Sequence, residues 1–284
     1  MTNWATFIAG CMSSLLLVSA SMADSAPGGV PFELYRGYII VAEGEIGPLG
    51  GLHFLIDTGT MPSIVDKKIT HRLRLSGGAE SLRSSGRNIK GQRVALPGLK
   101  FGPIQVESVP VLVRDLSSIE EALGARIDAV LGLDVLRSRS FSIDFPARRI
   151  RFAPDSPALP SPTINSQLGG MVVEAELQGH PLHLLVDTGA RDLILFKEQI
   201  RGCLPKLRVI GELNISKLGG KVRLQQVVLP PIYLGDQELA NPRAFLMDAP
   251  TDEPFGIDGL LGVVSLGVRS LSFDFERHRM TWVH

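Results

Sequence analysis

The segment Leu55-Ile56-Asp57-Thr58-Gly59-Thr60 occurs a second time as Leu185-Val186-Asp187-Thr188-Gly189-Ala190, at a spacing of 130 residues. An internal repeat decides the architecture before any single element does. Three further blocks recur in the same order, two at the same spacing and the last at 133 residues: 127–132 with 257–262, 141–145 with 271–275, and 94–97 with 227–230. The chain is therefore expected to contain two copies of one structural unit.

Each unit is expected to consist mostly of β-strands. An apolar run leads directly into each Asp-Thr-Gly, and the chain's 30 glycines and 19 prolines supply many turns. Short helices are predicted at residues 66–74 and 117–123. In the second of these, Ser117 and Glu120 have the spacing of a capping box.

The composition excludes several classes of protein. The 284 residues carry 29 Lys and Arg against 29 Asp and Glu, so no net charge favours nucleic acid or an anionic membrane surface. A hydrophobic content of 44% and a charged content of 20% exclude a disordered chain. The two cysteines, Cys11 and Cys203, are too few for a disulfide scaffold or a cysteine-built zinc site.

The N-terminal segment has the pattern of an export signal. Residues 1–23 carry no charged side chain and end in the small-x-small sequence Ser21-Met22-Ala23. We interpret them as a signal peptide, which predicts a periplasmic or secreted protein of the bacterial cell envelope. An uncleaved anchor and lipidation at Cys11 are the alternatives, and either would attach the protein to a membrane.

The mature chain then divides into three parts. Residues 24–153 form the first lobe and residues 169–284 form the second. Between them, residues 154–168 contain Pro154, Pro157, Pro160 and Pro162, which indicates a semi-extended linker.

The repeated motif has residue types that suit a shared carboxylate site. An aspartate at the end of an apolar strand is costly to bury without partners. Glycine lets the backbone turn tightly and brings amide donors close to a carboxylate. The threonine hydroxyl can form a hydrogen bond across to the other copy. Two such loops together predict two aspartates that face each other.

These motifs resemble those of the aspartic proteases, specifically the bacterial retropepsin-like aspartyl proteases with both lobes in one chain. The resemblance covers roughly residues 32–284. It implies a mainly β fold with two homologous retropepsin-like or pepsin-like β-barrel lobes, related by a pseudo-twofold axis, and a few short helices. It also implies that Asp57 and Asp187 are the catalytic dyad at the floor of a cleft. The same resemblance assigns supporting roles in the loops to Thr58, Gly59, Thr60, Thr188, Gly189 and Ala190, and places Gly132 and Gly262 behind them.

The implied activity is that of an aspartic endopeptidase. Two nearby carboxylates share one proton, so that one activates water while the other protonates the peptide carbonyl. No metal or cofactor is required, the substrate is an extended polypeptide, and one chain supplies a complete site. The alternative is a catalytically weak peptide-binding module of the same fold in the cell envelope.

The two copies differ directly after the motif, where Thr60 corresponds to Ala190. A threonine hydroxyl can donate to the neighbouring carboxylate, whereas alanine cannot. We hypothesise that Asp57 is the more readily ionised partner and Asp187 the more readily protonated one. The dyad titrates as a unit, so only its macroscopic behaviour can be observed.

The family places a flap at residues 81–93, a stretch with four basic and no acidic residues. Arg87, Lys90 and Gly91 are candidate flap residues, with Gly219 and Gly220 in the matching region of the second lobe. A basic flap would favour acidic substrates, and the alternative interpretation is a solvated loop.

Other repeated residues are interpreted as structural. Asp128 and Asp258 are expected to serve turns or caps, as are Asp144 and Asp274. His53 and His183, four residues before each aspartate, lack further ligands at useful spacing and are interpreted as ordinary strand side chains. Asp134 corresponds to Val264, which argues against a shared catalytic role.

Overall fold

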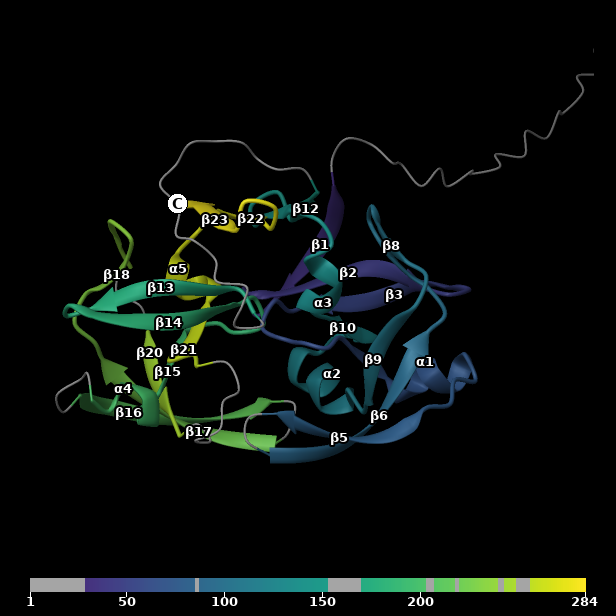
Figure 1. Ribbon diagram of the computed structural model, residues 1–284, viewed down its shortest axis with the longest axis horizontal. Coiled ribbons are helices and arrows are strands. Elements are labelled where there is room, and N and C mark those ends of the chain that lie inside the picture. The colour runs from purple at the N-terminus through teal and green to yellow at the C-terminus, as the bar shows by residue number, and fades with distance from the viewer. Residues whose placement is uncertain are drawn as a thin grey trace, which may run out of the picture.

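The computed structural model describes residues 29–84, 87–152, 170–202, 207–217, 220–239, 243–248 and 256–284. Within these ranges, residues 79–84, 87–90, 215–217, 220 and 221 are described by their backbone alone. We call residues 29–152 lobe 1 and residues 170–284 lobe 2. Figure 1 shows the two lobes side by side, each built around a twisted sheet. The predicted N-terminal signal, the linker and Cys203 lie outside the described residues.

Lobe 1 contains twelve of the described strands and three helices. The strands are β1 (Val30–Tyr35), β2 (Ile39–Ile46), β3 (Leu49–Ile56), β4 (Ile64–Asp66), β5 (Gly78–Ser84), β6 (Arg87–Leu96), β7 (Leu99–Phe101), β8 (Ile104–Val106), β9 (Val109–Arg114), β10 (Ala129–Leu131), β11 (Phe141–Asp144) and β12 (Arg149–Arg151). The helices are α1 (Lys67–Arg72), α2 (Ser117–Leu123) and α3 (Leu133–Leu136).

Lobe 2 contains eleven of the described strands and two helices. The strands are β13 (Val172–Leu177), β14 (His180–Asp187), β15 (Leu193–Phe196), β16 (Arg208–Lys217), β17 (Gly220–Val228), β18 (Ile232–Leu234), β19 (Gln237–Glu238), β20 (Ala244–Met247), β21 (Gly259–Gly262), β22 (Ser270–Asp274) and β23 (Arg279–Val283). The helices are α4 (Lys197–Ile200) and α5 (Val263–Leu266).

The two lobes repeat the same strand order. Nine strands of lobe 1 follow one another as β5-β6-β9-β4-β10-β3-β2-β7-β8, and the nine-stranded sheet of lobe 2 runs β16-β17-β20-β15-β21-β14-β13-β18-β19. Parallel and antiparallel pairings also agree: β10 is parallel to β3 and antiparallel to β4, as β21 is to β14 and β15. The predicted mainly β fold with two homologous lobes is confirmed.

A shared sheet joins the lobes. The hairpin β11–β12 of lobe 1 pairs with the hairpin β22–β23 of lobe 2 through antiparallel contact between β11 and β22. In this register Ser142 lies opposite Ser272, its own equivalent in the repeat. A pseudo-twofold axis therefore passes between these two serines.

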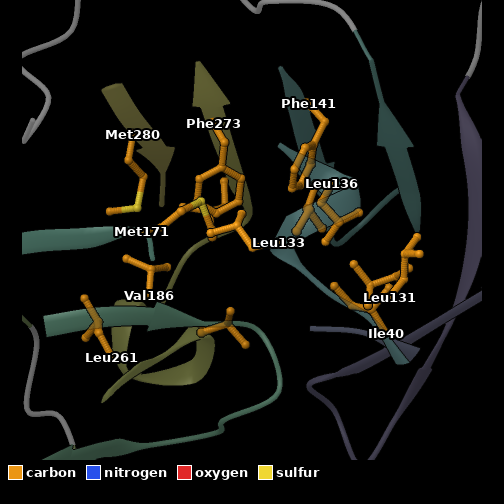
Figure 2. Close-up of a cluster of buried hydrophobic side chains, with 14 of the residues drawn as sticks. Ile40, Leu131, Leu133, Leu136, Phe141, Met171, Val186, Leu261, Phe273 and Met280 are labelled. Carbon is orange, nitrogen blue, oxygen red and sulfur yellow. The ribbon is translucent and has the colours of Figure 1, made fainter. Parts of the chain in front are cut away.

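The hydrophobic core is continuous across that axis. One cluster of buried side chains includes residues of both lobes. Figure 2 shows Leu133, Leu136 and Phe141 of lobe 1 beside Phe273 of lobe 2. The ring centroids of Phe141 and Phe273 are 5.0 Å apart. Burial of large apolar and aromatic surface here fixes how the lobes sit against each other.

Both predicted helices exist, but the capping box does not. Helix α2 begins at Ser117, and its N-cap is Leu116, without a side-chain cap bond. The Leu116 N–H donates instead to the buried Asp66 carboxylate at 2.8 Å, and Glu120 accepts from the N–H of Ile127 at 3.2 Å. Asp66 also caps α1 by accepting from the Lys68 N–H. None of the helices in the described ranges is long and apolar enough to cross a membrane.

Candidate active site

Two short loops on the pseudo-twofold axis bring Asp57 and Asp187 together. Each loop begins where a central strand ends, after β3 in lobe 1 and at the end of β14 in lobe 2. A Cβ atom on Gly59 would lie 2.5 Å from Asp187 Cγ, and one on Gly189 would lie 2.9 Å from Asp57 Cγ. Each loop glycine therefore lies against the aspartate of the other lobe, and a larger residue would push the carboxylates apart.

The two threonines of the motif cross-link the loops. Thr58 Oγ1 donates to the Val186 carbonyl at 2.8 Å and accepts from the Thr188 N–H at 3.0 Å. Thr188 Oγ1 makes the equivalent bonds, to the Ile56 carbonyl at 2.9 Å and from the Thr58 N–H at 3.0 Å. Both threonines are buried. The four bonds satisfy four backbone groups and both hydroxyls, which folding removes from water, and they hold the loops in register.

The two carboxylates have different hydrogen-bond partners. Asp57 accepts from the Gly59 N–H at 2.9 Å and from the Thr60 hydroxyl at 2.7 Å. Asp187 accepts from two backbone N–H groups, those of Gly189 at 2.7 Å and Ala190 at 3.1 Å. The Thr60 bond is the one expected from the difference between the two copies.

The environment of Asp187 favours its protonated form. Burial raises the pKa of Asp187 well above its ordinary value, and the Asp57 charge and a hydrogen bond with Asp57 add to that effect. The bonds from Gly189 and Ala190 act in the opposite direction but are smaller. Two carboxyls in this arrangement can hold one proton between them.

Gly132 and Gly262 lie directly behind the loops. A Cβ atom on Gly132 would lie 2.4 Å from the Thr60 carbonyl oxygen, and one on Gly262 would lie 2.5 Å from the Arg191 carbonyl carbon. The backbone of each loop therefore lies directly on a glycine. A side chain there would displace the loop that carries the aspartate.

Lobe 1 has an additional brace that we did not predict. Asp134 accepts from the N–H of Ser63 at 3.0 Å and from its hydroxyl at 2.6 Å, and Ser63 Oγ in turn accepts from the Gly132 N–H at 2.8 Å. Leu193 and Val264 occupy the equivalent positions in lobe 2. The sequence carried a signal for this brace, because Asp134 and Ser63 are both polar where their repeat partners are apolar.

The repeated His and Asp residues form matched structural pairs. Asp128 accepts from the His53 N–H at 2.9 Å, and Asp258 accepts from the His183 N–H at 2.7 Å. Each aspartate thus binds the neighbouring strand, where we had expected a turn or cap. In the described ranges, no group of three or more His, Cys, Asp or Glu side chains could hold a metal ion.

Asp144 and Asp274 do serve turns, as predicted. Asp144 accepts from the Ala147 N–H at 2.9 Å, and Asp274 accepts from the Arg277 N–H at 3.0 Å. Both turns connect strands of the interlobe sheet, in the hairpins β11–β12 and β22–β23.

Long hairpins occupy both predicted flap regions. Strands β5 and β6 pair up to Ser84 and Arg87, and β16 and β17 pair up to Lys217 and Gly220. Figure 1 shows both hairpins along the lower edge of the molecule. A Cβ atom on Gly91 would lie 3.3 Å from the Arg114 guanidinium. Of the other candidate flap residues, Arg87, Lys90 and Gly220 are described by their backbone, and Gly219 lies outside the described residues.

Comparison with known proteins agrees with this geometry. The family model for aspartyl proteases matches residues 42–135 and again residues 173–264. The first match contains Asp57 and Gly132, and the second contains Asp187 and Gly262. No curated protein matches the chain significantly. Since the two matches cover more than half of the sequence and coincide with the two lobes, the chain belongs to the aspartyl protease family.

Proposed function

We propose that the protein is an aspartic endopeptidase that hydrolyses peptide bonds of extended polypeptides with water activated between Asp57 and Asp187. One observation carries the proposal: each loop glycine lies against the aspartate of the opposite lobe. That contact makes a single site from two halves of the chain.

The unequal surroundings support distinct roles for the two carboxyls. The Thr60 hydroxyl donates a hydrogen bond to Asp57, while burial and the neighbouring charge favour the protonated form of Asp187. Asp57 then accepts a proton from water as the water oxygen bonds to the peptide carbonyl carbon. Asp187 donates its proton to the carbonyl oxygen. Collapse of this tetrahedral intermediate breaks the C–N bond, and the leaving nitrogen takes up a proton from the dyad.

The fold also supports binding of an extended substrate. The hairpins β5–β6 and β16–β17 lie at the ends of their sheets, with β5 and β16 as the edge strands. Edge strands present unpaired backbone N–H and C=O groups, to which an extended peptide can pair. Closure of such hairpins over the peptide would exclude water from the dyad.

The test is digestion of a mixed peptide library by the purified chain between about pH 3 and pH 8. Asp57→Asn and Asp187→Asn are each expected to lower kcat by about 10²- to 10⁴-fold, since each removes one proton-transfer group. Asp236→Asn, at an exposed turn between β18 and β19, is the matched control and should cleave like the wild type. A folded wild-type protein that cleaves no peptide, or dyad variants with full activity, would overturn the proposal.

A further inference from the structure

The residues after the two catalytic loops differ in charge. Lobe 1 continues with Met61 and Pro62, whereas lobe 2 continues with Arg191 and Asp192. Met61 is a large apolar side chain with 41% exposure, and the Arg191 side chain is also 41% exposed. Two equivalent positions beside the dyad therefore present an apolar surface on one side and a guanidinium on the other.

A neighbouring strand extends the contrast. Strands β4 and β9 pair in parallel in the same way as β15 and β20. In this register Arg243, directly before β20, corresponds to Pro110 of β9. Lobe 2 thus has two arginines and one aspartate where lobe 1 has three uncharged residues. The lobe 2 group carries a net charge of about +1 at neutral pH.

Asp192 orients the guanidinium of Arg191. The Asp192 side chain is 12% exposed, and its two oxygens lie 3.2 and 3.3 Å from Arg191 Nη1. Arg243 Nε lies 4.0 Å from the same carboxylate, with its guanidinium over the Phe245 ring. In the described part of the chain, the bonds of the Arg191 guanidinium run from Nη1 to Asp192. Its remaining N–H groups are available to an incoming carboxylate, which a planar guanidinium binds well.

Arg191 also lies where the two lobes meet. Its carbonyl accepts from the Val264 N–H at 3.0 Å, which fixes the backbone four residues after Asp187. Tyr38 of lobe 1 lies within electrostatic range of this loop: burial raises the pKa of Tyr38, the Arg36 and Arg191 charges lower it, and the Asp192 and Asp187 charges raise it. Gly189, two residues before Arg191, lies against Asp57 of lobe 1, so Arg191 directly follows the contact between the two lobes.

We infer that Arg191 is a specificity-determining residue that binds an acidic substrate side chain on one side of the scissile bond, while Met61 contacts an apolar side chain on the other. The inference rests on the proposed peptidase function. An extended peptide that crosses the pseudo-twofold axis places side chains at equal distances from the scissile bond against equivalent residues of the two lobes. Because Arg191 and Met61 differ in charge, a peptide with one acidic and one apolar side chain would bind in one direction only.

The test compares kcat/KM for peptides that differ only in Asp or Glu against Asn or Gln at one position. The wild type is expected to prefer the acid at one position by about 10-fold, the effect of one charged hydrogen bond. Arg191→Met should reduce that ratio to near one. Arg191→Glu should reverse the preference in favour of Lys or Arg.

Two further variants sharpen the result. Met61→Arg should create a second acid preference at the mirror position, equally far from the scissile bond on the other side. Arg201→Met removes another lobe 2 arginine, which is exposed and paired with Glu198, and should leave the preference unchanged. A wild type without acid preference would overturn the inference. An Arg191→Met variant that keeps the preference would also overturn it, and would direct attention to the basic β5–β6 hairpin as its source.

A binding measurement separates this inference from the proposed function. Fluorescence anisotropy with the same peptides can be measured on the full chain carrying Asp57→Asn, with and without Arg191→Met. Acid-selective binding that depends on Arg191 would support the inference even if the wild type cleaved nothing. Cleavage by the wild type without acid selectivity in either assay would reject the inference and leave the peptidase function standing.

Discussion

The two halves of the site share a frame but not a set of hydrogen bonds. In both lobes a central strand ends at the Asp-Thr-Gly loop, a glycine lies behind that loop, and a His–Asp pair fixes the preceding strand. Around that frame, Thr60 and the Ser63–Asp134 brace belong to lobe 1, whereas Ala190, Leu193 and Val264 replace them in lobe 2.

The difference between the lobes shows which contacts both loops must make and which can vary from one lobe to the other. Contacts that cross the axis must be made by both loops, so the threonine bonds are duplicated with nearly equal lengths. Contacts within one lobe are free to diverge. Divergence there has a chemical use, because a dyad of one base and one acid needs two unlike environments.

The largest expected effect comes from breaking the shared frame. Thr58→Val keeps the shape but leaves the Val186 carbonyl and the Thr188 N–H without their buried partner. We expect it to lower the free energy of unfolding by about 3 kcal/mol, and Thr188→Val to do the same. Chemical denaturation of the purified chain measures both, with Thr58→Ser as the control that keeps the hydroxyl. Costs that differ by more than about 1 kcal/mol would show that the two loops do not contribute equally.

A smaller effect is expected where the lobes have diverged. Asp134→Ala removes the acceptor of the Ser63 N–H and hydroxyl and should lower the free energy of unfolding by about 2 kcal/mol. Val264→Ala, at the equivalent but 40% exposed position, should cost less than about 0.5 kcal/mol. The same denaturation experiment compares them. Equal costs would mean that the brace contributes nothing beyond the packing at this position.

Much of the frame could be predicted from the sequence because its signals are local and repeated. The strand before each loop, the pairing of Asp57 with Asp187 and the threonine bonds across the axis follow from a motif that occurs twice. The contrast between Thr60 and Ala190 likewise indicated the hydrogen bond to Asp57.

The remaining features depend on partners that are distant in the sequence. Asp134 meets Ser63 because the loop and α3 fold together, and the chain separates them by 71 residues. The capping box at Ser117 was wrong because the Ser117 N–H donates to Asp115, while Glu120 accepts from the Ile127 N–H and from the Lys68 ammonium of another helix. The pairing of β11 with β22 needs the two lobes to be docked first, and short apolar strands do not specify their partner.

The asymmetry of the dyad can be tested through Thr60. Thr60→Ala makes lobe 1 resemble lobe 2, and loss of a donor to the ionised carboxylate should move the acidic limb of the pH–rate profile upward by about one pH unit. Ala190→Thr adds a donor on the other side and should reduce the difference between the partners. Profiles of kcat/KM measure both variants, with Thr60→Ser as the control. If both limbs stay in place for Thr60→Ala, the hydrogen bond does not set the asymmetry.

The smallest expected effect is a change of stability with pH. Its sign tells whether the folded protein favours the protonated or the ionised form of Asp187. The folded protein raises the pKa of this carboxyl, so the folded chain holds the proton more tightly than the unfolded chain. Stability from Asp187 is therefore complete at acidic pH and falls as the pH rises above about 4. Asp187→Asn escapes that loss, because an amide oxygen can still accept from the Gly189 and Ala190 N–H groups.

Melting temperatures between pH 4 and pH 8 should therefore show Asp187→Asn gaining on the wild type as the pH rises, with Asp236→Asn as the unchanged control. A variant that is less stable than the wild type at pH 7 would mean that the ionised Asp187 stabilises the loop, and the roles of the two lobes would have to be exchanged. If Asp187→Asn melts at a higher temperature than the wild type at neutral pH and no longer cleaves peptides, then keeping a protonated carboxyl next to an ionised one lowers the stability of lobe 2. The two lobes share the geometry of their loops, but only lobe 2 would bear this loss of stability.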